Sequence, residues 1–375
     1  MLRDLKIENY RLFHQFEINS LAGVNLIVGN NNSGKSSLLE AIHLLTSDET
    51  RSSLIYILSE RGEVSSGMLD PRIDRFRTGG YQISQIFHDR LITLGQYADF
   101  QSHFDKAMSL RIVLQESHPQ KTNESDQLTL FEKDEIVDDI VLGGNAEFLV
   151  FERHGNGADT QRESLRITED GVVIDNRSSS IRRVSHPKGK SRLLTTNYIG
   201  YDELAILWDR ITLTPKEDKV VEALKILEPL VDRISFTSSQ TSNSGILLRL
   251  KGENDPIPLG SMGDGMRRIM AIIASLVSVE KGTLLVDEID TGLYHGALTD
   301  MWRLVLETSA KQDAQVFATT HSWDCVRAFQ QALDKFKDPE IGRLIRLEKF
   351  GNKVNAILYS ADELDIAIEQ GIEVR

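Results

Sequence analysis

The chain has 375 residues, 40% of them hydrophobic and 26% charged, and a formal net charge of −13. This is the composition of a globular protein large enough for one substantial core or two lobes. It has no apolar run of the roughly 18 residues that a membrane span needs, and its charged start lacks the apolar region of a signal peptide. Its single cysteine, Cys325, excludes an intrachain disulfide and a multi-thiolate zinc site. We therefore expect a cytoplasmic protein without membrane contact, in which any nucleic-acid contact is local because the net charge is acidic.

The first half of the chain predicts a hairpin, a strand–helix unit and a long variable region. Two alternating runs flank residues 9–13, which predicts a β-hairpin. Residues 47–108 are expected to be largely helical, with interruptions at glycine and proline. Residues 109–115 alternate as a strand, residues 116–135 are polar enough for an exposed loop, and β signals recur from residue 136 to about residue 198.

The second half predicts helices and short strands in alternation. Residues 202–231 are expected to be helical with a break at 213–215, where Thr214 and Pro215 fit a helix start. The elements expected after this break are a strand pair at 234–236 and 246–250, a helix at 263–280 and a strand at 283–287.

A phosphate-binding loop of the form G-x-x-x-x-G-K-[ST] lies between an apolar strand at 24–28 and a helical pattern at 36–46. Its residues, with the serine that follows, are Gly29, Asn30, Asn31, Asn32, Ser33, Gly34, Lys35, Ser36 and Ser37. The glycines let the backbone curl so that successive N–H groups point to one anion, and the helix start adds partial positive charge. We expect Lys35 to reach the β- and γ-phosphates of a nucleotide and the Ser36 hydroxyl to bind Mg²⁺.

Two acids, Asp287 and Glu288, follow the apolar run at 283–286. Buried parallel strands are apolar in this way, and acids at their carboxyl ends meet the ligand. We expect Asp287 to hold Mg²⁺, directly or through water, and Glu288 to polarise the attacking water.

Two further motifs could complete an anion site. Ser261, Gly263 and Gly265 precede a strongly apolar helical pattern and offer a hydroxyl and free N–H groups, although an ordinary serine cap with flexible glycines reads the same way. His321 follows a short apolar strand at 316–319, which suggests a γ-phosphate sensor, with a structural histidine as the alternative.

One local basic segment, residues 182–192, stands out in this acidic chain. It contains no acid and five cations: Arg182, Arg183, Lys188, Lys190 and Arg192. The segment is either a solvated loop or a contact for phosphate or for a partner.

Taken in order, the phosphate loop, the serine–glycine turn, the strand ending in Asp287-Glu288 and the strand end Thr319-Thr320-His321-Ser322 resemble an ABC-class ATPase of the SMC/RecF/OLD type. The loop is most similar to the OLD-like branch, known as "AAA family ATPase" (AAA_15/AAA_21). This resemblance implies an α/β P-loop NTPase fold of the ABC-ATPase type. Its core would comprise residues 1–46 and 200–375, with a helical and then β-rich region inserted at 47–200.

The resemblance also implies ATP and Mg²⁺ as ligands and Arg11 near the nucleotide. It implies a head-to-tail dimer, or a higher oligomer, in which the Ser261 turn of one subunit caps the γ-phosphate held by the other. Three departures qualify it. The turn reads Ser-Met-Gly-Asp-Gly where transporters have Ser-Gly-Gly-Gln, and the family's Q-loop glutamine could be Gln82, Gln85 or Gln115. The chain after His321 is also too short for the Toprim nuclease domain of OLD proteins.

Three functions are compatible with these features. The first is an ATPase that switches a separately encoded effector protein, in bacterial antiphage defence. The second is a RecF-like DNA-repair ATPase that binds nucleic acid, for which the basic segment 182–192 is the candidate contact. The third is a transport motor, which the signature departure disfavours.

Overall fold

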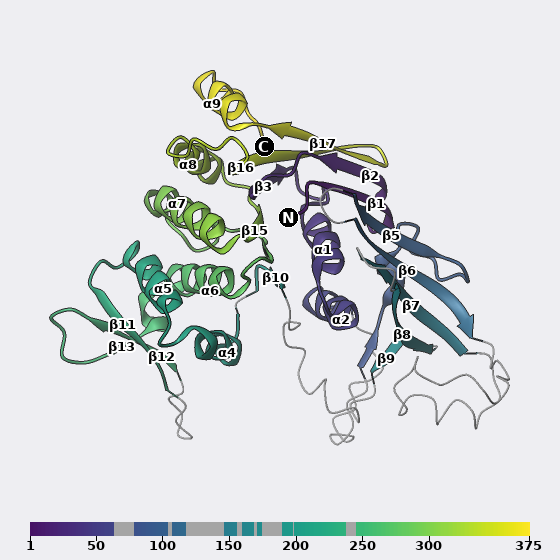
Figure 1. Cartoon of the computed structure of the whole chain (residues 1–375), viewed down its shortest axis with the longest axis horizontal. Coiled ribbons are helices and arrows are strands. Elements are labelled where there is room, and N and C mark those ends of the chain that lie inside the picture. The colour runs from purple at the N-terminus through teal and green to yellow at the C-terminus, as the bar shows by residue number, and fades with distance from the viewer. Residues whose placement is uncertain are drawn as a thin grey trace.

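The computed structural model contains three β-sheets, arranged in layers with helices between and around them (Figure 1). The residues that the structure describes are 1–63, 79–103, 107–117, 146–155, 160–168, 171–174, 190–197, 199–237 and 245–375. Within these residues, no helix is both long and apolar enough to cross a membrane.

The central sheet has six strands, and its five leading strands are parallel. Their order is β10 (Ser191–Leu194), β14 (Thr283–Val286), β15 (Gln315–Thr319), β3 (Val24–Gly29), β16 (Gly342–Phe350) and the antiparallel edge strand β17 (Lys353–Tyr359). The carboxyl ends of parallel strands lie at one edge of a sheet. The loops that follow β3, β14 and β15 therefore meet there.

Helices cover both faces of this sheet (Figure 1). One face packs on α4 (Tyr201–Ile211), α5 (Pro215–Lys225), α6 (Asp264–Ser278), α7 (His295–Gln312), α8 (Trp323–Leu333) and α9 (Ala361–Glu369). The other face packs on α1 (Lys35–Thr46) and α2 (Thr50–Glu60). Side chains alternate across a strand, so Leu26 of β3 joins the first core and its neighbour Ile27 joins the second. A strand buried on both faces is continuously apolar for this reason.

The second sheet has eight strands, and all its pairs are antiparallel. Its order is β2 (Phe13–Asn19), β1 (Asp4–Tyr10), β5 (Tyr97–Ser102), β6 (Met108–Ser117), β7 (Ala146–His154), β8 (Thr160–Thr168), β9 (Gly171–Ile174) and β4 (Gly79–Tyr81). The predicted N-terminal hairpin is confirmed, because Tyr10 pairs with Phe13 across a two-residue turn. Strand β5 pairs with β1, so the region expected as an insert extends the sheet that the hairpin begins.

A third, three-stranded sheet, which lies beside α5 (Figure 1), completes the fold. It contains β11 (Val231–Thr237), β12 (Gly245–Leu250) and β13 (Ile257–Pro258), and the short helices η2 (Ile83–Ile86) and η3 (Leu259–Met262) lie elsewhere in the chain. The predicted strand pair at 234–236 and 246–250 is confirmed by the β11–β12 pairing.

Two expectations for the helices have different outcomes. The predicted break before Pro215 is confirmed, because the Thr214 side chain accepts a hydrogen bond from the Lys216 backbone N–H and caps α5. The expected helix over 47–108 is wrong beyond α2 in the described part of this range. There, β5 alternates half-buried and buried residues and places Ala98 and Phe100 in the core. The expected loop at 116–135 and the β signal at 136–137 lie outside the described residues from residue 118 onward.

Candidate active site

The phosphate loop is shaped by residues whose backbone few side chains tolerate. Gly29 has φ 145°, and a Cβ built on it would lie 2.5 Å from the Leu347 carbonyl oxygen. Gly34 has φ 101°, and Asn32 has φ 60°. Only glycine adopts the first two conformations readily, and asparagine tolerates the third. The loop therefore curls tightly between β3 and the start of α1, as a phosphate cradle requires.

Lys35 lies inside this curl. Its Nζ donates to the carbonyl oxygens of Gly29, at 2.7 Å, and Asn30, at 2.9 Å. Burial lowers the pKa of Lys35, while the nearby carboxylates of Asp287 and Glu288 act to raise it. The Ser33 hydroxyl is also buried and has no hydrogen-bond partner among the described residues. A cradle with a cation and an unsatisfied hydroxyl has the chemistry to take an anionic phosphate group.

A pair of oxygen ligands lies beside Lys35. The Ser36 hydroxyl donates to Asp287 Oδ2 at 2.8 Å, and the Thr319 hydroxyl donates to Asp287 Oδ1 at 2.5 Å. The described residues contain no group of three or more His, Cys, Asp or Glu side chains that could cage a metal. Mg²⁺ characteristically takes one or two protein oxygens and completes its shell with water and phosphate, so Ser36 and Asp287 fit this ion.

Glu288 is held in an uncommon backbone conformation for a residue with a side chain, with φ 48°. Its N–H donates to the Thr319 hydroxyl at 2.8 Å, and its carboxylate accepts from the Thr291 hydroxyl at 3.4 Å. Thr319 therefore contacts both acids and fixes the turn that follows β14. Backbone strain of this kind is found at functional sites.

These groups line one hollow of about 250 Å³ at the carboxyl edge of the parallel sheet. Its walls are Asn31, Asn32, Gly34, Lys35, Ser36, Ser37, Arg61, Asp287, Glu288 and His321. Three loops from distant parts of the sequence thus meet where the parallel topology predicted.

Arg61 is the lining residue that sequence reasoning missed. It is the C-cap of α2, and its Nε pairs closely with Glu40 of α1. An arginine at the end of an irregular helical stretch gives no signal in the sequence, because only the packing of α2 against α1 brings it to the hollow.

Arg11 does not line this hollow, although the family resemblance implied that it lies near the nucleotide. Its guanidinium donates to both Glu63 oxygens, at 2.8 and 3.0 Å, and its Nε lies 2.7 Å from Glu40 Oε2. The Tyr10 hydroxyl also donates to Glu40, at 3.2 Å. Glu40 therefore joins Arg11 to Arg61, and Arg11 acts in this structure as a brace behind the hollow.

The serine–glycine turn also lies outside the hollow of its own chain. Ser261 and Gly263 are exposed, in η3 and at the residue before α6, while Gly265 is buried. The candidate glutamines do not line the hollow either, and Gln115 accepts a hydrogen bond from Arg162 in the eight-stranded sheet.

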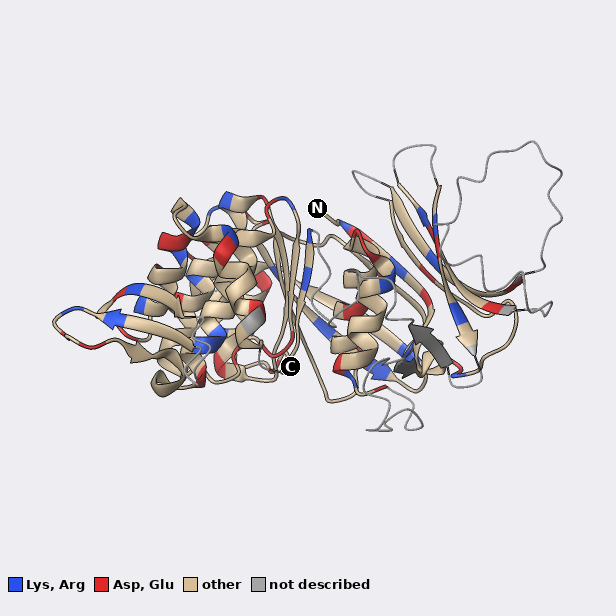
Figure 2. Ribbon diagram, turned by 90° about the horizontal axis from the view of Figure 1, so that it is seen from below, with Lys and Arg blue, Asp and Glu red and all other residues tan. Residues whose placement is uncertain are grey.

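The basic segment is only partly described. Residues 182–189, which include Arg182, Arg183 and Lys188, lie outside the described residues. Lys190 is exposed. Arg192 contradicts the expectation of a free cation, because it is part of β10 and its Nη2 pairs with Glu203 at 2.7 Å. Basic and acidic residues alternate over the rest of the described ribbon (Figure 2).

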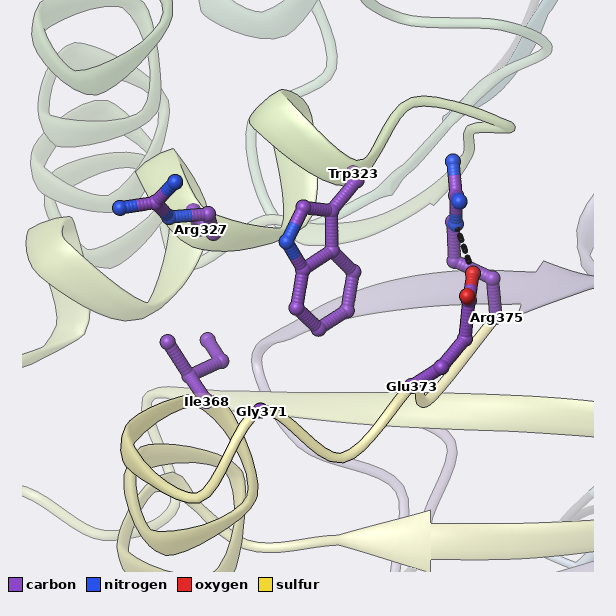
Figure 3. Close-up of a pocket in the computed structure, with 6 residues that line it drawn as sticks. All are labelled: Trp323, Arg327, Ile368, Gly371, Glu373 and Arg375. Carbon is purple, nitrogen blue, oxygen red and sulfur yellow. Dashed lines mark hydrogen bonds and ion pairs between the residues drawn. The ribbon is translucent and has the colours of Figure 1, made fainter.

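A second hollow, of about 380 Å³, lies next to the first on the far side of His321. It is lined by Trp323, Arg327, Ile368, Gly371, Glu373 and Arg375 (Figure 3). Arg375 pairs with Glu373 and donates from Nη1 to the His321 carbonyl oxygen at 3.1 Å. The backbone of His321 is thus held from the second hollow while the residue itself lines the first.

Comparison with known proteins places the chain in a family. The model of the AAA_21 family, described as "AAA domain, putative AbiEii toxin, Type IV TA system", matches residues 24–324. Since this is most of the sequence, the chain belongs to this family. The expected α/β P-loop ATPase of the ABC type is thereby confirmed.

One curated relative and several solved structures are also similar. The relative is named "ATP/GTP phosphatase", comes from Helicobacter pylori (strain ATCC 700392 / 26695), and is 20% identical over 360 residues, 89% of this chain and 88% of the relative. An Smc head bound to the C-terminal winged-helix domain of ScpA is 14% identical, with a TM-score of 0.47 over 98% of this chain and 99% of that one. The Smc head with an extended coiled coil bound to the C-terminal domain of ScpA, derived from Pyrococcus furiosus, is 12% identical, with a TM-score of 0.49 over 99% of both chains.

Proposed function

We propose that this ATPase forms a dimer around ATP and that the ATP-bound dimer switches a separately encoded effector protein in a bacterial defence system. One observation carries the proposal. The hollow holds the groups that bind and attack a nucleotide, but the serine–glycine turn lies outside it and is exposed at Ser261 and Gly263. An anion-binding turn that its own chain does not use is available to the hollow of a second copy.

Within one chain, each residue at the hollow has a chemical task. Lys35 and the N–H groups at the start of α1 hold the β- and γ-phosphates, and Ser36 and Asp287 hold Mg²⁺. The Mg²⁺, when bound, neutralises charge that develops on the phosphate oxygens. Glu288 orients a water molecule and accepts its proton, while His321 contacts the γ-phosphate. Thr319 keeps Asp287 and Glu288 in register through its contacts with both.

The partner half of the proposal is supported by what the described residues offer outside the hollow. They hold no metal cluster that could serve as a second catalytic centre, and the one cysteine is buried. Burial raises the pKa of the Cys325 thiol, which keeps it in its unreactive form. The output of ATP turnover is therefore a change in the geometry of two protomers, and a partner that prefers one geometry shifts their population.

The family description supports a defence role, since it names a toxin of a toxin–antitoxin system. The RecF-like alternative is weaker, because Arg192, one of the five cations proposed to contact nucleic acid, is paired with Glu203.

The proposal is tested with the protein encoded next to this chain's gene. The Glu288→Gln variant is expected to retain ATP, and its affinity for that neighbour is measured with ATP and with ADP by calorimetry. We expect the two affinities to differ by about 5- to 150-fold, the usual range of allosteric coupling. Equal affinities in ATP and ADP would contradict the switch. Tight, salt-dependent binding of duplex DNA in the same assay would favour the repair alternative.

A further inference from the structure

Arg268 links the helix that carries the serine–glycine turn to the two acids of the hollow. It belongs to α6, and its side chain is buried. Its Nη1 donates to the Thr195 carbonyl at 2.9 Å, and its Nη2 donates to the carbonyls of Asp287, at 2.5 Å, and Glu288, at 3.2 Å. A planar guanidinium suits this task, because its donors are fixed in one fork.

The peptide groups on both sides of Glu288 are therefore fixed by other elements. The Glu288 N–H is held by Thr319 of β15, and its carbonyl is held by Arg268 of α6. The residue between them has φ 48°, a conformation that persists only where the surroundings hold it. Since the backbone sets the direction of the side chain, Arg268 helps to set where the Glu288 carboxylate points.

A second contact joins the start of α6 to the same segment. A Cβ built on Gly265 would lie 2.5 Å from the Gly292 carbonyl oxygen, so the backbones of the serine–glycine turn and of the turn after Glu288 pack directly together. Helix α6 thus touches the segment 287–292 at its beginning, through Arg268, and near its end, through Gly265. A displacement at the start of α6 reaches Glu288 through these two contacts.

We propose that Arg268 is a positioning residue that couples the serine–glycine turn to Glu288. It rests on the proposed function, because the event that would move the start of α6 is contact with the nucleotide held by a second copy. Arg268 itself touches no reacting atom. It holds the Glu288 peptide so that the carboxylate faces the water only when α6 is correctly placed.

The test compares Arg268→Met and Arg268→Lys with a matched control, Arg192→Met. Arg192 is another largely buried arginine next to the parallel sheet, but it pairs with Glu203 and not with the acids of the hollow. For Arg268→Met we expect kcat to fall about 10- to 100-fold, the scale of a misplaced catalytic group, with the Kd for ATP changed less than about 2-fold. Arg268→Lys should recover part of kcat, and Arg192→Met should retain it. The lysine variant also serves if the methionine variant does not fold.

A double substitution separates positioning from general damage. If Arg268 acts through Glu288, adding Arg268→Met to Glu288→Gln should lower the single-turnover rate no further. Multiplying effects, an equal fall in kcat and ATP affinity, or the same loss in Arg192→Met would overturn the proposal. If the wild-type chain does not dimerise with ATP, the proposed function fails; if it does dimerise and Arg268→Met keeps full kcat, only the role of Arg268 fails.

Discussion

The two large sheets share helix α1 but contribute different things to the molecule. The parallel sheet ends three strands at one edge, and the residues after those strands form the hollow. The antiparallel sheet contributes support instead. Arg11 at its hairpin braces Glu40 of α1, and Arg153 of β7 donates to the Leu45 carbonyl at 2.7 Å and to the Leu44 carbonyl at 2.9 Å, at the last turn of α1. Chemistry thus depends on topology at one sheet, and the placement of α1 depends on long-range contacts from the other.

The largest expected effect breaks the first region alone. Lys35→Ala removes the cation that neutralises the β- and γ-phosphates, so ATP turnover should fall by about 100-fold or more. The melting temperature should change little, because the Lys35 Nζ bonds only loop carbonyls in the described structure. A phosphate-release assay and a thermal melt measure the two quantities, and wild-type turnover would refute the phosphate-loop assignment.

The matched effect in the second region should appear in stability. Arg153→Met leaves the last carbonyls of α1 and the Thr50 hydroxyl without their donor. The free energy of unfolding should fall by about 1–3 kcal/mol, while kcat per folded molecule stays within about 2-fold of wild type. Urea denaturation and the same turnover assay check this. A large loss of kcat at full stability would show that the antiparallel sheet takes part in the chemistry.

A smaller, pH-dependent effect sharpens the comparison at α1. His43 is fully buried against β10, and burial, with the nearby charge of Arg192, lowers its pKa to about 3. Between that value and about 6.5, the unfolded chain binds a proton that the folded chain does not. Stability is therefore lost as the pH falls through this window, by at most about 1.4 kcal/mol per pH unit. Urea denaturation from pH 7 to pH 5 should show a shallower slope for His43→Asn, and an unchanged slope would contradict the assignment.

The same comparison explains how far the sequence could be interpreted. The phosphate loop, Asp287 and Glu288 were predictable, because short motifs at strand ends record their own backbone needs, such as the positive φ of Gly34. The strand β5 and the lining residue Arg61 were not, because β5 owes its state to pairing with β1 and Arg61 reaches the hollow through Glu40. Arg11 and Arg192 were expected at ligands, and ion pairs with distant residues hold them elsewhere. Long-range partners leave no local pattern.

The central claim is that two copies of the chain close around ATP through the serine–glycine turn. Its most direct test is the molar mass of Glu288→Gln, measured by light scattering with and without Mg²⁺ and ATP. We expect the mass to double with ATP. In the same background, Ser261→Arg should remain monomeric while it still binds ATP, because its own hollow is untouched. A Glu288→Gln variant that binds ATP as a monomer, or an Ser261→Arg variant that still doubles its mass, would contradict the account.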